Sequence, residues 1–241
     1  MHDVIVNIFD SVSTIDLLTE EECLKIRSVV DNLQEYWVQR APDLPFYSVG
    51  AASYLDAVED NAIYYQKVKL YNPILSDNFD WLYQKLAQKL SSILDDPVIF
   101  QETLALRGFH IFKAHKAFEQ PMASTHRDLQ YKLLNWEEPE KIDFNNTLSL
   151  TLAIALPHDG GGLLTWDLHH DNMQTITNEQ INSIIAQGAK HYHPYEIGKF
   201  VLHSGHEVHQ IAPGQNLQPL DERITLQGHC LRTQDSWWFY W

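Results

Sequence analysis

The sequence predicts an α+β fold in which helices come first and the following strands close into a jelly-roll-like barrel. Two observations lead to this fold class: apolar residues recur at helical spacing before residue 104, and they alternate with a period of two after it. Turn sequences such as Ala212-Pro213-Gly214 separate the expected strands. A chain of 241 residues suits one domain, 1–241, with 1–103 as mainly helical support and 104–241 as the jelly-roll core.

The helical part begins with a capping box, because Thr19 is followed by Glu22 three residues later. One apolar face follows it, made of Cys23, Ile26, Val30, Leu33 and Trp37. A second apolar stripe from Phe79 to Leu94 starts after Ser76 and Asp77 and ends at the Asp95-Asp96-Pro97 turn. The stretch 53–72 is ambiguous and could contain a shorter helix around 61–70. A third helix is expected at 178–187, capped by Thr177 and Gln180.

The strand part is clearest from Leu148 to Leu156, where large aliphatic residues alternate with Ser149, Thr151, Ala153 and Ala155. Such a strand would place its large residues against helices and its small residues toward a ligand-containing interior. The other expected strands are 104–113, 163–167, 200–203, 208–211, 223–231 and 237–241. The last of these, an aromatic tail, is expected to cover the barrel, and part of it could line a substrate cleft.

Composition excludes several classes of protein. Lys and Arg number 17 against 32 Asp and Glu, and the net charge of −15 disfavours binding to nucleic acid or anionic lipid. Two cysteines can build neither a disulfide framework nor a thiolate zinc site, and their scarcity favours a cytoplasmic location. No run approaches the roughly 18 apolar residues of a membrane span, and Met1–Asp10 does not have the pattern of a signal peptide.

Thirteen histidines point to metal binding or to proton transfer near neutral pH. In His126-Arg127-Asp128, an imidazole and a carboxylate lie two residues apart, so on a strand both would face one metal ion. A competing copy, His169-His170-Asp171, is more easily explained as a solvated loop near the substrate. The motif therefore needs support from the rest of the chain.

That support comes from the order of the segments after it. Downstream lie a glycine-rich hairpin, 159–167, then a histidine-rich segment, 203–213, then Arg223-Ile224-Thr225. In this order the segments resemble the Fe(II)- and 2-oxoglutarate-dependent oxygenases, in particular their prolyl-4-hydroxylase-like branch, over about residues 104–232. The resemblance implies a double-stranded β-helix supported by N-terminal helices.

The resemblance also implies a site. His126, Asp128 and His209 would hold Fe(II) on one triangular face, which leaves three positions for 2-oxoglutarate and O2. Arg223 would bind the far carboxylate of 2-oxoglutarate, and Thr225 could add a hydroxyl hydrogen bond. From spacing alone, Arg223 could equally pair on the surface with Asp221 or Glu222.

The distal histidine has three candidates within seven residues. His209 is preferred because it lies in a strand pattern, fourteen residues before Arg223, and matches the position that the resemblance gives. His203 and His206 are then expected to be partly exposed residues at the rim. The pair His191 and His193 is expected at a loop or strand edge.

The implied reaction is hydroxylation of an unactivated C–H bond in an amino acid, a peptide side chain or a small metabolite, with release of succinate and CO2. The carboxylate of Asp128 favours hydroxylation over halogenation. Two alternatives stay open: a cupin-type metalloenzyme, from the imperfect pattern His191-x-His193 with Glu196, and a non-catalytic binding or sensor protein. The negative charge weakly suggests a cationic substrate. The sequence does not indicate an oligomeric state.

Overall fold

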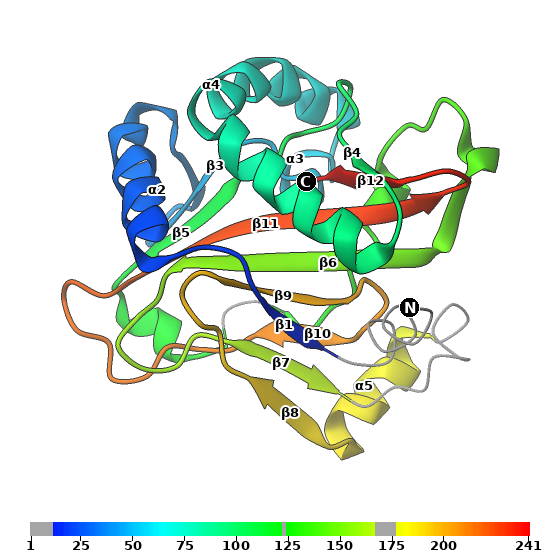
Figure 1. Ribbon diagram of the computed structural model, residues 1–241. Coiled ribbons are helices and arrows are strands. Elements are labelled where there is room, and N and C mark those ends of the chain that lie inside the picture. Colours follow the sequence, from blue (N-terminus) through cyan, green and yellow to red (C-terminus); the bar gives the residue numbers. More distant parts are fainter. Residues whose placement is uncertain (1–11, 122–123, 167–176) are drawn as a thin grey trace.

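The computed structural model describes residues 12–121, 124–166 and 177–241, which form two sheets with helices packed on the larger one (Figure 1). The segment Met1–Asp10 and the second His-x-Asp copy, 169–171, lie outside the described residues. In the part of the chain that is described, no helix combines the length and hydropathy that crossing a membrane requires.

The larger sheet has nine strands in the order β1-β9-β6-β11-β5-β3-β2, with β12 and β4 joined to it through β11. All its pairings are antiparallel except that of β12 with β4. Its strands are Ser13–Asp16 (β1), Val38–Ala41 (β2), Leu44–Val49 (β3), Val98–Ile99 (β4), Phe109–Lys113 (β5), Ile142–Ala155 (β6), Lys199–Ser204 (β9), Glu222–Thr233 (β11) and Trp237–Tyr240 (β12).

The smaller sheet is antiparallel and has the order β10-β7-β8. Its strands are Leu163–Trp166 (β7), Lys190–His193 (β8) and His209–Ile211 (β10). Within the described ranges no strand ladder joins the two sheets, so they do not form the closed barrel expected from the sequence. The architecture is that of mostly antiparallel sheets, with α2 and α4 packed on the larger sheet and α5 packed on the smaller one.

The helices are Glu20–Asn32 (α2), Ser53–Asp56 (α3), Asn61–Leu94 (α4) and Asn178–Gln187 (α5). Four short 3-10 turns lie at 34–36, 116–119, 130–133 and 139–141. The capping box of α2 is confirmed: Glu22 N–H donates to Thr19 Oγ1 and Thr19 N–H donates to Glu22. The helix ends before Trp37, which leads instead into β2. The expected helix 178–187 is confirmed with its bounds and its cap.

The start expected for the second helix was wrong. Helix α4 begins after Asp60, whose side chain accepts from Ala62 N–H, and it runs through Pro73 for 34 residues. The shorter helix considered around 61–70 is thus the first part of the same helix. Its buried face includes Tyr64, Val68 and Leu75, and this burial outweighs the roughly 3 kcal/mol that an internal proline costs. The end at Asp95 is as expected.

Strand β6 has one face on the hydrophobic core and the other face on a pocket. Leu148, Leu150 and Leu152 pack in one cluster with residues of α4, whereas Ser149 and Thr151 line a pocket on the other face. This confirms the two faces predicted from the alternation. On that face, Leu163 of β7 clusters with residues of β6 and β9, and Figure 1 shows the smaller sheet on the side away from α4. The helices thus support the large sheet from behind the pocket.

The first third of the chain also contributes four strands that sequence patterning missed, β1 to β4, each of six residues or fewer. Strand β8 was missed as well, although its place at the edge of the small sheet matches the expectation for His191 and His193. The aromatic tail forms β12, paired with β11, and Trp241 at its end is completely buried. The tail is therefore a covering strand, as expected.

Candidate functional site

His126, Asp128 and His209 come together although the two outer residues, His126 and His209, are 83 positions apart in the sequence. One ligand atom from each lies within 4.8 Å of the others. The Nε2 atom of His126 is 3.7 Å from Asp128 Oδ1, and that of His209 is 3.4 Å from Asp128 Oδ2. We call these three residues the triad.

Backbone hydrogen bonds hold the two halves of the triad in register. His126 and His209 exchange N–H···O bonds of 2.9 Å in both directions, and Asp128 N–H donates to Gly205 O at 2.8 Å. The sequence placed His126 and Asp128 on a regular strand, but the structure gives an isolated bridge in an irregular segment. A Cβ at Gly205 would lie 2.5 Å from Thr147 Oγ1, so glycine permits this close approach.

The two imidazoles are oriented through their Nδ1 atoms. His126 Nδ1 lies 2.8 Å from Ser124 O, and His209 Nδ1 lies 2.9 Å from Glu207 O. A carbonyl only accepts, so each Nδ1 carries the proton and each Nε2 presents its lone pair toward Asp128. Such an outer hydrogen bond is the usual support of a metal-binding histidine.

The charges of the triad also suit a metal ion. Burial lowers the pKa of His209 to about 3, which leaves its imidazole neutral. Burial works to raise the pKa of Asp128, but His209, His229 and other neighbouring imidazoles hold it well below its ordinary value. Two imidazole nitrogens and one carboxylate on one side of a pocket fit a non-haem Fe(II) centre.

Arg223 is buried, and it is not a surface residue paired with its neighbours. Only 7% of it is exposed, and its Nε and Nη2 atoms have no hydrogen-bond partner among the residues that the structure describes. Glu222 instead pairs with Arg27 and with Lys113. The Arg223 guanidinium lies 4.9 Å from the ring of Phe112 and 5.8 Å from that of Tyr195. A buried cation without a counter-charge is suited to bind a carboxylate.

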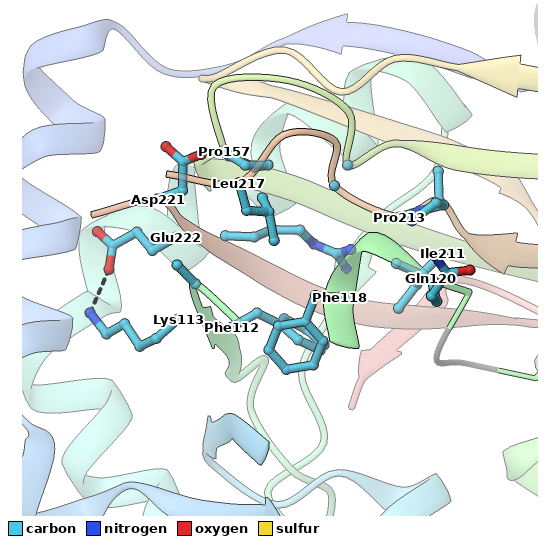
Figure 2. Close-up of a pocket in the computed structure, with 15 residues that line it drawn as sticks. Phe112, Lys113, Phe118, Gln120, Pro157, Ile211, Pro213, Leu217, Asp221 and Glu222 are labelled. Atoms are coloured by element: carbon cyan, nitrogen blue, oxygen red, sulfur yellow. Dashed lines mark hydrogen bonds and ion pairs between the residues drawn. The ribbon is translucent and has the colours of Figure 1, made fainter. Parts of the chain in front are cut away.

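The cavity around Arg223 is drawn in Figure 2. Phe112 and Phe118 form one wall, Leu217 and Pro157 lie across from them, and the Lys113–Glu222 pair lies at one side. Phe112, Phe118 and Ile211 also line the pocket that contains the triad, so the two cavities share walls. Arg223 therefore lines a cavity next to the triad pocket, and the apolar residues just named line both spaces.

Thr225 is fully buried and its Oγ1 accepts a 2.8 Å hydrogen bond from Gln227 Nε2. The ladder between β11 and β6 shifts register between Ile224 and Thr225. Thr225 does not line either cavity, whereas Gln227 lines the triad pocket. The structure therefore does not bring Thr225 into direct contact with the space beside Arg223.

No protein-family model matches the chain, and no curated protein matches its sequence. Solved structures do match it. AviO1 from Streptomyces viridochromogenes Tue57 has a TM-score of 0.58 at 16% identity, over 98% of this chain and 96% of that one. A dioxygenase of N-substituted L-amino acids from Burkholderia ambifaria AMMD has a TM-score of 0.58 at 17% identity, over 99% and 89%.

The epimerase SnoN from nogalamycin biosynthesis, a non-haem enzyme dependent on α-ketoglutarate (2-oxoglutarate), has a TM-score of 0.59 at 11% identity, over 96% and 82% of the two chains. This chain has the fold of the 2-oxoglutarate-dependent oxygenases. Identities this low establish the fold, and the chemistry has to be argued from the side chains themselves.

Within this oxygenase fold, two expectations about histidines were wrong. His203 and His206 are 3% and 4% exposed, so they are not rim residues. The His203 ring lies 4.7 Å from that of His209 and lines the pocket, while His206 Nε2 lies 3.1 Å from Phe144 O. Both expectations followed from the preference for His209 as the ligand, whereas the turn at Gly205 between these two histidines is covered by Thr147 and Asp128.

Two functional histidines were missed. His229 Nδ1 lies 3.8 Å from Asp128 Oδ2 and 3.2 Å from Ser149 Oγ, and His110 also lines the pocket. His229 could have been found, because it lies six residues after Arg223 on one strand and so faces the same side. His110 comes from β5, and its position depends on pairing with β11.

The cupin-like pattern does not assemble. His193 Nε2 bonds to Thr165 Oγ1 at 3.0 Å, His191 is exposed on β8, and Glu196 pairs with Lys199. In the described ranges, the triad is the group of His, Cys, Asp and Glu side chains that could hold a metal ion.

Proposed function

We propose that this chain is an Fe(II)- and 2-oxoglutarate-dependent dioxygenase that hydroxylates an unactivated C–H bond, with release of succinate and CO2. The observation that carries the proposal is the triad together with the buried, unpartnered Arg223 beside the same pocket. The fold supports it, and we propose that the two sheets are the two halves of a double-stranded β-helix. Residues 1–241 then form one oxygenase domain, which we place in the cytoplasm.

Each residue has a defined task in this proposal. His126, Asp128 and His209 hold Fe(II), which supplies the oxygen chemistry and leaves three coordination positions for 2-oxoglutarate and O2. Arg223 binds the distal carboxylate of 2-oxoglutarate with its planar guanidinium. Tyr195, buried beside Arg223, completes the wall around that carboxylate. Thr225 acts indirectly, through its hydrogen bond with Gln227.

The carboxylate of Asp128 also bears on the type of reaction. A halogenating relative would have a small residue at this ligand position to leave room for halide, and here the position holds a carboxylate close to both histidines. Hydroxylation is the outcome that this arrangement favours. The substrate is an amino acid, a peptide side chain or a small metabolite that enters the triad pocket.

The test is spectroscopic. Anaerobic addition of Fe(II) and 2-oxoglutarate should produce the visible charge-transfer band of the chelate, and His126→Ala or His209→Ala should abolish it. His193→Ala, on the smaller sheet, is the matched control and should keep the band. If His169→Ala abolishes the band while His126→Ala leaves it intact, the ligand set is wrong.

Activity separates an enzyme from a binding or sensor protein with the same fold. The iron-loaded protein should form succinate when it is incubated with free amino acids, peptides or small metabolites, and Arg223→Ala should raise the concentration of 2-oxoglutarate needed. A chelate band without succinate formation on any of these substrates would favour the non-catalytic alternative.

A further inference from the structure

Part of the lining of the triad pocket is an aromatic wall. Phe46 of β3, Phe112 of β5 and Phe118 of the 3-10 turn 116–119 all line the pocket, and each side chain is partly exposed. The rings of Phe46 and Phe112 stack with centroids 4.2 Å apart and planes at 7°, and Phe118 meets Phe112 edge-on at 5.1 Å. Partly exposed apolar rings inside a pocket are suited to cover the face of another ring.

The pocket offers little charge to a substrate. Among the described lining residues the cations are limited to Arg40, which donates to Asp56 at 2.6 and 2.9 Å and to Ser48 at 2.6 Å. The one carboxylate in the same lining is that of Asp128, which belongs to the triad. A charged substrate group would therefore lose water without finding a free partner of opposite charge.

The polar groups near the aromatic wall are neutral. The Tyr54 hydroxyl lies 2.7 Å from His110 Nε2, and both residues line the pocket. Burial lowers the pKa of His110 well below its ordinary value and raises that of Tyr54, so neither group is charged near neutral pH. This pair is equipped for hydrogen bonds to hydroxyl or carbonyl groups rather than for ion pairs.

We propose that the substrate is an uncharged small molecule that lays an aromatic or alicyclic ring against Phe46, Phe112 and Phe118 and directs a hydroxyl or carbonyl group toward Tyr54 and His110. This inference rests on the proposed function, because it places the substrate in the pocket of the triad. Of the three substrate classes considered above (an amino acid, a peptide side chain and a small metabolite), it selects an uncharged small metabolite. It also replaces the cationic substrate suggested by the net charge, since among the described acidic residues Asp128 of the triad is the one that lines this pocket.

The test uses one ring system in three charge states. Binding of 2-naphthylmethanol, 2-naphthoate and 2-naphthylmethylamine to the full chain is compared by ligand-observed NMR at pH 7. Zn(II) and saturating 2-oxoglutarate are present, so that the triad and Arg223 are already engaged. The alcohol should bind at least tenfold more tightly than either charged analogue. Equal or tighter binding of the carboxylate or the amine overturns the proposal.

Two variants link that binding to the wall. Phe46→Ala should weaken binding of the alcohol by about tenfold, and Phe46→Leu, which keeps an apolar side chain, should weaken it less. Tyr47→Ala is the matched control, because Tyr47 is the next residue on β3 and packs against Trp37 outside the pocket. If Phe46→Ala and Tyr47→Ala behave alike, the wall is not the binding surface.

Failure of the proposed function would appear separately. Calorimetry should show that 2-oxoglutarate binds only with metal present and that Arg223→Ala weakens this binding. If 2-oxoglutarate binds but the neutral analogue is not preferred, the inference about substrate is wrong and the proposed function stands. If 2-oxoglutarate does not bind, the proposed function itself is wrong.

Discussion

His229 shows how a single side chain outside the triad can govern it. It is 6% exposed, and its Nδ1 lies closest to Ser149 Oγ and next to the Asp128 carboxylate. Its ligand atoms do not fall within the triad cluster, so we expect it to act on a bound metal ion through Asp128 and not as a ligand. We expect a residue in this position to restrict the carboxylate, and with it the geometry of a bound metal ion.

We expect His229→Gln to weaken Co(II) binding by about 10- to 100-fold and to alter the visible spectrum of the bound Co(II). The variant His229→Asn should lose much less affinity for Co(II), because the Asn amide nitrogen occupies the place of the imidazole Nδ1. The Gln amide nitrogen occupies the place of Nε2 instead. A Co(II) titration followed by absorbance measures both effects, with His193→Asn as the control. Equal affinities for the Gln variant and the wild type would show that His229 does not position Asp128.

At the scale of elements, the helices serve as the support behind the large sheet. Helix α2 contributes Ile26 and Val30 to the core cluster, and α4 contributes residues from Tyr71 to Leu94, against the leucines of β6. Strand β6 in turn carries Ser149 and Thr151 on its pocket face. Loosening a helix therefore affects the strand that forms the floor of the site.

Thr19→Ala should lower the free energy of unfolding by about 1 kcal/mol, because it removes the side-chain oxygen that caps α2. Urea denaturation followed by far-UV circular dichroism measures the change. Glu21→Ala, an exposed position in the same helical turn with no role in the capping box, should stay within about 0.5 kcal/mol of the wild type. A loss of the same size in both variants would mean that the cap does not stabilise the helix.

At the scale of the whole molecule, one buried carboxylate joins three elements. Asp56 at the end of α3 accepts hydrogen bonds from Arg40 of β2 and from Lys67 of α4, and its side chain is 2% exposed. Burial alone would raise the pKa of Asp56, but the bonds from Arg40 and Lys67 outweigh it and hold the pKa below its ordinary value. The network connects the hairpin that carries Phe46 to the main helix.

The pH dependence follows from that direction. A carboxyl group whose pKa is lower in the folded chain stabilises the fold above its unfolded pKa of about 3.9, and this contribution is lost as the pH falls through the folded value. Asp56→Asn should cost about 3–5 kcal/mol at pH 7, because it leaves Arg40 buried without its partner. Urea midpoints should show this difference shrinking below pH 4. A difference that is constant from pH 7 to pH 2 would contradict the assignment.

Much of the architecture could be predicted because it depends on local patterns. The capping box at Thr19 and the alternation in β6 both concern neighbouring residues, and both were confirmed. The start of α4 was misplaced, because Ser76 and Asp77 have the local pattern of a helix start, whereas the burial that carries the helix back through Pro73 to Asn61 depends on tertiary packing. Strands as short as β2 and β4 carry too few residues for a pattern and exist because a partner strand lies beside them.

The sequence by itself determined the residue types and spacing of His126, Asp128, His209 and Arg223, and the resemblance that they carry. Tertiary structure alone decided that the imidazoles of His126 and His209 turn their Nε2 atoms toward one carboxylate, that Arg223 is buried without a partner, and that His229 lies behind Asp128. The physical reason is that spacing along a chain fixes the face on which a side chain lies. Burial, charge and the nearest atom depend on strands paired across the sheet from distant parts of the sequence.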